Sequence, residues 1–294
     1  MDNKQQPKNA VHLSEAAHRE KALQVFAYVV LGIGALSMIM PFLWMITTSL
    51  KTLDAIYIRP KNWIQMFIPT MFIWDNYVQA FKVVPFAKFY MNSIIVGIAV
   101  TIGQVFTSSL AAYAFSRLEF RGRDKLFFAY LATMMIPGSV TMIPVYVLMR
   151  LFGWVDTFKA LIIPAIFSAY GTFMLRQFFM TLPKDLEDAA KIDGCGFFRI
   201  YTTIILPLSK PALATLTVFT FMGNWGSFMW PLLVTNSVNM RTLPIGLESF
   251  KTQYSTDWHF LMAGSVMAML PIVIIFIFTQ RYFVESIKLT GVKG

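Results

Sequence analysis

The sequence predicts an all-α integral membrane protein with six transmembrane helices. Apolar residues make up 56% of the 294 positions and charged residues only 14%, and the charges fall between long uncharged windows. About 20 helical residues at 1.5 Å each cross the hydrocarbon of a bilayer. The formal net charge of +10 lies in clusters between the apolar windows, so membrane topology explains it and nucleic-acid binding is not expected. The single cysteine, Cys195, excludes an internal disulfide and a cysteine metal cage.

The first window follows a polar tail at residues 1–21, which we expect to become helical near Ser14. Residues 22–50 then carry no charge, which is longer than the apolar part of a signal peptide. We therefore expect a retained transmembrane helix at about 22–48.

Five more windows complete a six-span domain at residues 22–283, with spans at about 89–115, 126–149, 158–178, 209–233 and 259–281. Pro137 and Pro144 interrupt the third span and Pro231 the end of the fifth, where kinks are tolerated if neighbours satisfy the freed carbonyls. Hinges and simple structural bends both fit these prolines. Most Lys and Arg lie on the cytoplasmic side if the N-terminus is inside, so both termini and residues 181–208 are expected in the cytoplasm.

Residues 181–208, between spans four and five, look like a small folded object. Pro183 suits a first helical turn, three acidic residues follow where the helix dipole favours them, and Gly194 can adopt the left-handed conformation that ends a helix. We expect a helix of about two turns from Leu186 to Asp193. Its middle, Ala189 and Ala190, offers a flat patch suited to docking into another protein's groove.

This segment resembles the cytoplasmic coupling loop of ABC-importer permeases, whose pattern is Glu-Ala-Ala, three residues, Gly, nine residues, Ile, one residue, Leu-Pro. Asp188 stands in the Glu place, and the matching positions are Ala189, Ala190, Gly194, Ile204, Leu206 and Pro207. Residues 175–179 and 192–194 are similar to the carbohydrate-importing subset. An ordinary loop helix of another membrane protein is the alternative.

The resemblance implies a type I ABC importer permease fold with this segment as a coupling helix. Asp188 would pair with a basic residue of a partner ATPase, Ala189 and Ala190 would fit its groove, and Gly194 would set the turn. The implied ATPase-coupling set also includes Asp193, Leu206 and Pro207. ATP and Mg²⁺ would bind to partner ATPase subunits, and this chain would need no cofactor.

Two further segments share the resemblance. The polar outer loop at 235–257 corresponds to the loop that reaches into a sugar-binding protein docked outside, with Asn236, Asn239, Leu243, Pro244 and Gly246 as its candidates; a solvated connector is the alternative. The cytoplasmic tail at 284–294 resembles the ending of maltose-type permeases, which enters the interface between the ATPase subunits. Its candidates are Gly291, Lys293 and Gly294.

Catalytic chemistry is not expected. The sequence has no Gly-rich loop ending in Gly-Lys-Ser or Gly-Lys-Thr, so an ATPase must be a separate subunit. The uncharged windows inside the spans, such as 160–175, 211–240 and 258–280, offer no Asp, Glu, Lys or Arg at mid-depth, which argues against an ion-coupled carrier. Three dispersed histidines do not suggest a membrane hydrolase or a metal site.

Neutral polar side chains remain as candidates for lining a pore: Asn92, Gln104, Asn224, Trp225 and Ser227. Amides, hydroxyls and an aromatic face suit an uncharged, hydroxyl-rich solute. Hydrogen bonds between helices explain the same residues. Gly226 and Ser227 stand where the family often has Asn and an acid, so the resemblance does not support a role for them.

Together these features predict a permease subunit of an ATP-driven, binding-protein-dependent importer of a sugar or oligosaccharide, in a bacterial cytoplasmic membrane. The expected partners are a second, similar permease in a heterodimer, two ATP-binding subunits, an external solute-binding protein and membrane lipid. A permease for glycerol phosphate or peptides is the nearest alternative. An ATP-independent channel is a more distant one.

Overall fold

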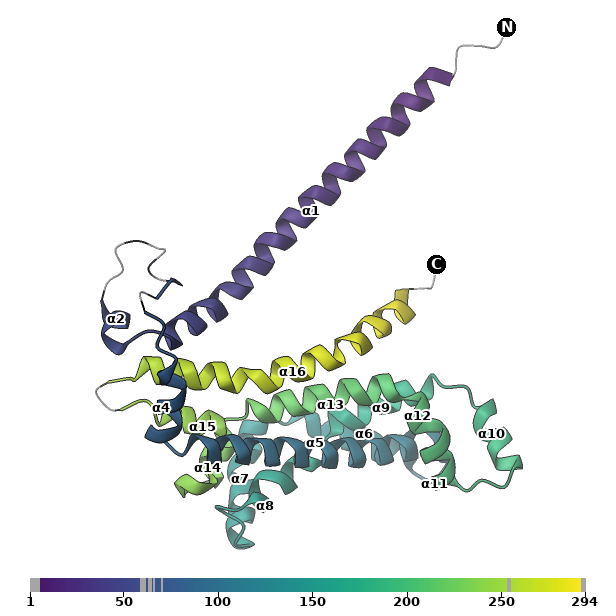
Figure 1. Ribbon diagram of the computed structural model, residues 1–294. Coiled ribbons are helices and arrows are strands. Elements are labelled where there is room, and N and C mark those ends of the chain that lie inside the picture. Colours follow the sequence, from purple (N-terminus) through teal and green to yellow (C-terminus); the bar gives the residue numbers. More distant parts are fainter. Residues whose placement is uncertain are drawn as a thin grey trace.

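The computed structural model is almost entirely helical (Figure 1). It describes residues 6–58, 62, 65, 67–69, 71–252 and 255–291, with side chains from residue 20 to residue 280 within those ranges. In this part of the chain the only β pairing is an isolated bridge between Lys251 and Thr256. The predicted all-α fold is confirmed.

The helices, in chain order, are α1 (Gln6–Ser49), α2 (Leu53–Tyr57), α4 (Asp75–Val83), α5 (Phe86–Arg117), α6 (Arg123–Ala132), α7 (Gly138–Leu151), α8 (Phe158–Ile162), α9 (Ala169–Met180), α10 (Asp185–Ile192), α11 (Phe197–Ile200), α12 (Leu206–Leu208), α13 (Lys210–Trp225), α14 (Met229–Val234), α15 (Leu243–Glu248) and α16 (Trp258–Gly291). Short 3₁₀ turns occur at η1 (Thr133–Met135), η2 (Ile163–Ile166) and η4 (Val238–Met240). A π-helix, η3 (Tyr201–Ile205), joins α11 to α12.

Four helical segments are long and apolar enough to cross a membrane: Glu20–Ser49, Phe86–Arg117, Phe158–Met180 and Trp258–Gln280. Two further candidates are bent pairs. The helices before and after Pro137 meet at 99°, and Phe197–Leu208 meets α13 at 80°. Up to six spans result if each bent pair counts as one.

Of the three prolines expected to interrupt spans, only Pro137 does so. The bend in the third span falls at Pro137, whereas Pro144 lies inside the continuous helix α7, so the interruption expected there is wrong. The fifth span does not break at Pro231, because that proline occupies the first turn of α14, where its missing N–H has no helical partner to lose. The break lies earlier, between the end of α13 at Trp225 and the start of α14 at Met229.

Helix α5 is the centre of the bundle and packs mainly against α9 and α13, while α13 also contacts α16. Figure 1 shows α10 and α11 beyond one end of these helices and α14, α15 and α4 at the other. An inner cluster of buried side chains joins α5, α9 and α13 to the α10–α12 segment: Ala112, Tyr113, Leu175, Phe179, Ala190, Ile200, Tyr201, Ile205, Ala212 and Leu216. An outer cluster fills the opposite end: Ala80, Val84, Phe86, Phe89, Phe221, Trp225, Leu243, Phe250 and Leu261.

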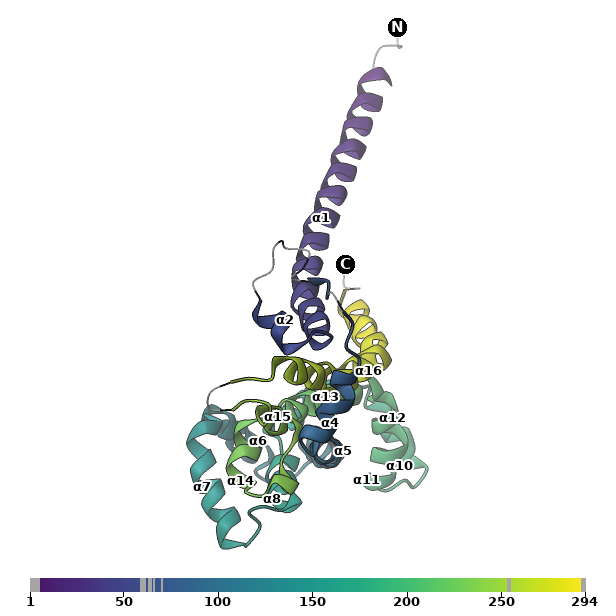
Figure 2. The same ribbon diagram turned by 60° about the vertical axis from the view of Figure 1, so that its left-hand side comes forward.

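Helix α1 leaves the bundle and extends away from it in both views (Figures 1 and 2). It contacts α16, and its apolar side chains are exposed, with Phe26 and Leu31 each 68% accessible. The helix already begins at Gln6, earlier than the Ser14 start expected from the sequence. Such an apolar surface requires lipid or another membrane subunit against it.

Candidate functional site

The α10 helix is a compact knob with a glycine stop at its end. The Cys195 N–H donates to the carbonyl of Ala190 at 2.9 Å, and the Gly194 N–H donates to that of Lys191 at 3.0 Å. This pair of bonds is a Schellman motif, which needs a left-handed residue, and Gly194 has φ +77°. The helix and its stop therefore form as the sequence predicted.

The two alanines of α10 face in different directions, because successive helical residues are rotated by about 100°. Ala189 is exposed, whereas Ala190 is only 8% exposed and belongs to the inner cluster. The flat two-alanine surface expected from the sequence is therefore wrong. The exposed apolar face of α10, which is the candidate docking face, consists instead of Leu186, Ala189 and Ile192, at a helical spacing of three, and Ile192 is 87% exposed.

A buried ion pair fastens α10 to the end of α5. Arg117 Nε lies 3.0 Å from Glu187 Oε1, with the two side chains 3% and 6% exposed. The same guanidinium donates to the backbone carbonyl of Leu182 at 2.8 Å and to that of Phe179. One arginine thus connects α5, the end of α9 and α10. From the sequence, Glu187 was expected only as one of three acidic residues that the helix dipole favours. Nothing nearby in the sequence indicates an ionic partner 70 positions away.

Asp188, the residue in the motif's acidic place, is on the solvent side of the knob. Its carboxylate accepts a 2.9 Å hydrogen bond from Lys191 Nζ, and that bond lowers the pKa of Asp188 and raises the pKa of Lys191. Asp193, the C-cap residue, is also exposed. A cavity of about 740 Å³ lies beside α10, with Arg117, Lys184 and Lys191 among its lining residues.

The segment after Gly194 returns the chain to the bundle and ends in a sharp bend. Ile204 and Leu206 pack against the inner cluster, and Pro207 lies in the last helical turn. The helix ends at Leu208, and α13 begins at Lys210 after the 80° change of direction. Leu206 and Pro207, from the implied coupling set, therefore lie at the end of this helix, just before the bend.

The outer loop is held to the bundle by side chains of α5. The Asn92 amide donates to the backbone carbonyls of Asn239 and Arg241 at 2.8 and 2.9 Å, and the Ser93 hydroxyl accepts from the N–H of Leu243 at 2.7 Å. Both amide hydrogens of Asn92 are thus used inside the chain. The residue that the sequence analysis placed among pore-lining candidates instead anchors a loop.

Part of the loop that was expected to contact a binding protein is buried against the bundle. Leu243 is 1% exposed, and a Cβ on Gly246 would meet the Phe89 ring at 2.1 Å, so α15 packs directly on α5. Pro244, in the first turn of α15, is half-buried. Asn236 and Asn239 are exposed, and Asn239 Oδ1 accepts from Lys88 Nζ at 3.0 Å. Of the five candidates in this loop, Asn236 and Asn239 are the two that are exposed.

Asp156 fixes the start of that tip. Its Oδ1 accepts from the N–H groups of Asn236 and Ser237 at 2.9 and 3.0 Å and from the Ser237 hydroxyl at 3.1 Å. Partial burial opposes ionisation, but these donors outweigh it and hold the pKa of Asp156 below its ordinary value. The residue has φ +62°, a conformation that Asp and Asn tolerate better than most side chains. Asp156 was not among the functional residues predicted from the sequence.

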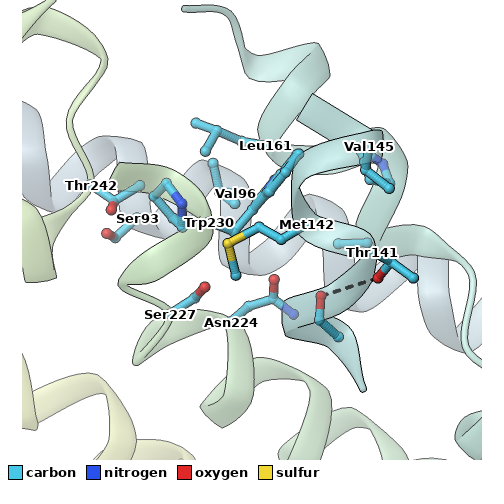
Figure 3. Close-up of a pocket in the computed structure, with 14 residues that line it drawn as sticks. Ser93, Val96, Thr141, Met142, Val145, Leu161, Asn224, Ser227, Trp230 and Thr242 are labelled. Atoms are coloured by element: carbon cyan, nitrogen blue, oxygen red, sulfur yellow. Dashed lines mark hydrogen bonds between the residues drawn. The ribbon is translucent and has the colours of Figure 1, made fainter. Parts of the chain in front are cut away.

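The remaining pore candidates separate into two groups. Asn224 and Ser227 line a cavity of about 350 Å³ next to α7 and α14 (Figure 3). Trp225 is 4% exposed and donates its indole N–H to the carbonyl of Ala268, so it packs the outer cluster. Gln104 is half-buried and does not line this cavity.

The candidates in the C-terminal tail lie at the edge of the structure. Gly291 is the last residue of α16, and Lys293 and Gly294 lie outside the described residues. In the part of the chain whose side chains are described, no group of three or more His, Cys, Asp or Glu is arranged to hold a metal ion.

Comparisons with known proteins agree with this architecture. Residues 104–289 match the family described as binding-protein-dependent transport system inner membrane component. The arabinooligosaccharides transport system permease protein AraQ of Halalkalibacterium halodurans is 39% identical over 230 residues, which cover 78% of this chain and 82% of that protein. The sn-glycerol-3-phosphate transport system permease protein UgpE of Agrobacterium fabrum is 34% identical over 273 residues, or 90% and 95% of the two chains.

Among solved structures, a chain of a bacterial ABC transporter involved in the import of the acidic polysaccharide alginate has the same fold. It superposes with a TM-score of 0.80 at 23% identity, covering 90% of this chain and 98% of that chain. This protein therefore belongs to the family of binding-protein-dependent transport system inner membrane components, and it is a multi-pass membrane protein with the ABC permease fold.

Proposed function

We propose that this chain is the non-catalytic permease subunit of an ATP-driven importer that receives a carbohydrate from a solute-binding protein. The observation that carries the proposal is the construction of α10. Its docking face is apolar and exposed, while its opposite face is fixed to the bundle by the Arg117–Glu187 pair and by Ala190 in the inner cluster. A knob that is free on one side and tightly held on the other is suited to transmit force from a partner.

The partners follow from the surfaces that this chain leaves exposed. Two ATP-binding subunits hold ATP and Mg²⁺, and one of them receives the docking face. A second permease, as the other half of a heterodimer, covers α1 together with lipid. The solute-binding protein meets the tip at Asn236 and Asn239. The assembly lies in a bacterial cytoplasmic membrane. Both termini are inside, because the far ends of α1 and α16 point toward the end of the bundle that carries α10, the helix that docks to the ATPase (Figure 1).

Mechanistically, closure of the ATPase dimer displaces α10. The buried ion pair passes that displacement to α5 and α9, and the inner cluster passes it to α13. Because packed helices move as rigid bodies, the bundle changes the side from which its pathway is open. ATP supplies the free energy, and no chemical step occurs in this chain.

The substrate class rests on the relatives. AraQ is named as a permease for arabinooligosaccharides and the solved transporter as an importer of alginate, and both are carbohydrates. Glycerol phosphate is the second candidate, since UgpE matches a larger share of this chain.

The coupling role is tested with Ala189→Arg in the full complex reconstituted in vesicles. The new side chain projects from the exposed face without entering the inner cluster, so the chain should insert and fold. We expect transport and ligand-stimulated ATPase activity to fall at least tenfold, since a misplaced charge at a desolvated contact costs more than about 1.4 kcal/mol. Ala189→Ser, which keeps the small size, should behave as the natural protein.

Full transport by the Ala189→Arg complex would overturn the docking role. The carbohydrate assignment is tested separately, by ATPase stimulation across a panel of saccharides with their binding protein. A panel in which only glycerol phosphate stimulates the complex would favour the second candidate.

A further inference from the structure

The short helix α4, at the end of the bundle opposite α10, carries an exposed apolar face. Trp74, the residue before its first turn, is 67% exposed, and Val78 and Phe81 are 52% and 46% exposed. At about 100° per residue these three side chains fall within an arc of about 60° on the helix surface. We call them the outer apolar face. Large apolar side chains gathered on one exposed face indicate an interaction surface.

Both ends of α4 are tied to helices that are long enough to cross the membrane. Near its start, the Asn76 amide donates to the carbonyls of Ser49 and Lys51 at 2.8 and 2.9 Å, which fixes it to the end of α1. Its last residue, Val83, lies three positions before Phe86, where α5 begins. The helix also packs against α16. It therefore runs across the outer ends of these spans instead of pointing away from them, as Figure 1 shows.

The charges of α5 place this level at the lipid headgroups. Lys88 is exposed in the first turn of α5, and the next charge along the chain that follows it is Arg117. The uncharged run between them is longer than the roughly 20 residues that cross the hydrocarbon, so the hydrocarbon begins beyond Lys88. Because α4 precedes Lys88 and runs across the ends of the spans, it lies in the interfacial layer.

Around its axis, α4 has three sides of different chemistry. Asn76, Ala80 and Val84 are buried against the bundle, and the last two belong to the outer cluster. The outer apolar face is rotated from that side by about 120°. The third side is polar and comprises Asp75, Gln79 and Lys82. Such a helix fits a membrane surface beside a protein, where its three sides meet the bundle, the acyl chains and water. Val83, which is 53% exposed, lies between the buried and polar sides.

The make-up of the outer apolar face favours lipid over a protein partner. Trp prefers the headgroup level of a bilayer, because its ring is apolar and its N–H is polar. The Phe81 ring packs edge-on against Phe86 with the ring centres 5.1 Å apart, so the face is continuous with the outer cluster. A protein that docks from the water would instead meet the polar side, with Asp75 and Lys82. These two opposite charges offset one another, so apolar burial and not charge would drive the contact with lipid.

We infer that α4 is an interfacial anchor, with Trp74, Val78 and Phe81 buried between the headgroups and acyl chains of the leaflet opposite α10. Because α4 is bonded to α1 and packed on α16, the anchor holds the outer ends of both spans at one depth. This inference concerns the lipid surface and does not depend on which solute is imported.

The test uses the assembled transporter in phosphatidylcholine vesicles. In a Cys195→Ser background, Val78→Cys and Phe81→Cys each carry a fluorophore on the outer apolar face, and Asp75→Cys carries it on the polar side of the same helix as the matched control. We expect lipids brominated near the carbonyl end of the acyl chain to quench positions 78 and 81 about twofold more strongly than position 75. Iodide in the water should quench them in the reverse order.

Equal quenching of all three positions by iodide would overturn the anchor. Protection of positions 78 and 81 that arises only after the solute-binding protein is added would also overturn it, because a protein would then be the occupant.

A second measurement uses the natural chain and therefore does not depend on the cysteine variants. A phosphatidylcholine with a diazirine on its acyl chain, present in the same vesicles, should label residues 74, 78 or 81 on illumination, read by mass spectrometry of the tryptic peptide that ends at Lys82. The segment Glu20–Ser49 is the positive control, because it is long and apolar enough to cross the membrane. Labelling of that segment without labelling on α4 would overturn the inference.

Discussion

The two ends of this permease are held together by different chemistry. At the inner end, a buried ion pair and a hydrophobic cluster fix α10 to three helices. At the outer end, Asn92, Ser93 and Asp156 hold a loop through hydrogen bonds to its backbone. Separating the two charges of the inner connection would leave them buried without compensation, so this connection resists rearrangement, which suits a part that transmits force. Each outer hydrogen bond is of modest net strength, and apolar packing of Leu243 adds to them, which leaves the exposed tip at Asn236 and Asn239 as the part suited to adapt to a docking protein.

The largest effect in this comparison is expected at the ion pair. Glu187→Leu leaves the Arg117 guanidinium buried with its ionic partner removed, and such a change costs on the order of 3 kcal/mol. The reduced stability should appear as a lower midpoint of thermal unfolding of the detergent-solubilised complex. ATPase stimulation should fall with it, because α10 loses its connection to α5.

The double variant Arg117→Leu with Glu187→Leu is the control for that prediction. Two apolar residues of similar volume replace both charges, and such exchanges are often neutral for stability. We expect the unfolding midpoint to recover while coupling recovers only in part, since the hydrogen bonds from Arg117 to the carbonyls of Phe179 and Leu182 are lost. A double variant no more stable than Glu187→Leu would contradict this account of the pair.

A smaller effect is expected at Gly194. An added Cβ would meet open space, so steric clash plays no part, but the φ of +77° disfavours a residue with a side chain by about 1 kcal/mol. Gly194→Ala should therefore fray the end of α10, measured as faster hydrogen exchange at Cys195 with little change in the global midpoint. Gly196→Ala is the control, because φ is −74° there and the site is also open.

The smallest effect is expected at the outer loop and depends on pH. The folded-state pKa of Asp156 lies below its ordinary value of 3.8, so the stabilisation is present above that ordinary value and is lost as the pH falls through the folded pKa. The protection factors for amide hydrogen exchange at Asn236 and Ser237, taken relative to the intrinsic exchange rate at each pH, should fall below about pH 4. Asp156→Asn keeps an acceptor oxygen and tolerates the positive φ, so the protection factors at Asn236 and Ser237 in this variant should not change with pH in this window. An identical acid response in that variant would remove Asp156 as the cause.

Local signals in the sequence were sufficient for α10 and its glycine stop, because dipole-favoured acids and Gly194 act within one or two turns. Uncharged windows were sufficient to predict the long helices, because the length of an apolar run also depends only on neighbouring residues. The burial of Glu187 was not predictable, since it depends on Arg117 at the end of another helix. The neutral polar residues were ambiguous because pore lining and helix packing require the same groups. Asn92 and Trp225 proved to be packing residues, whereas Asn224 and Ser227 line a cavity.

The bend at Ser209 joins two helical segments into an angled lever. Residues 197–208 and α13 are its two arms and meet at 80°, and both arms contribute side chains to the inner cluster near Ser209. A push delivered along the first arm from α10 therefore emerges as a sideways swing of the second. Asn224 lies in the last turn of that second arm, so a stroke made at the nucleotide-binding partner would reshape the wall of the cavity that Asn224 lines.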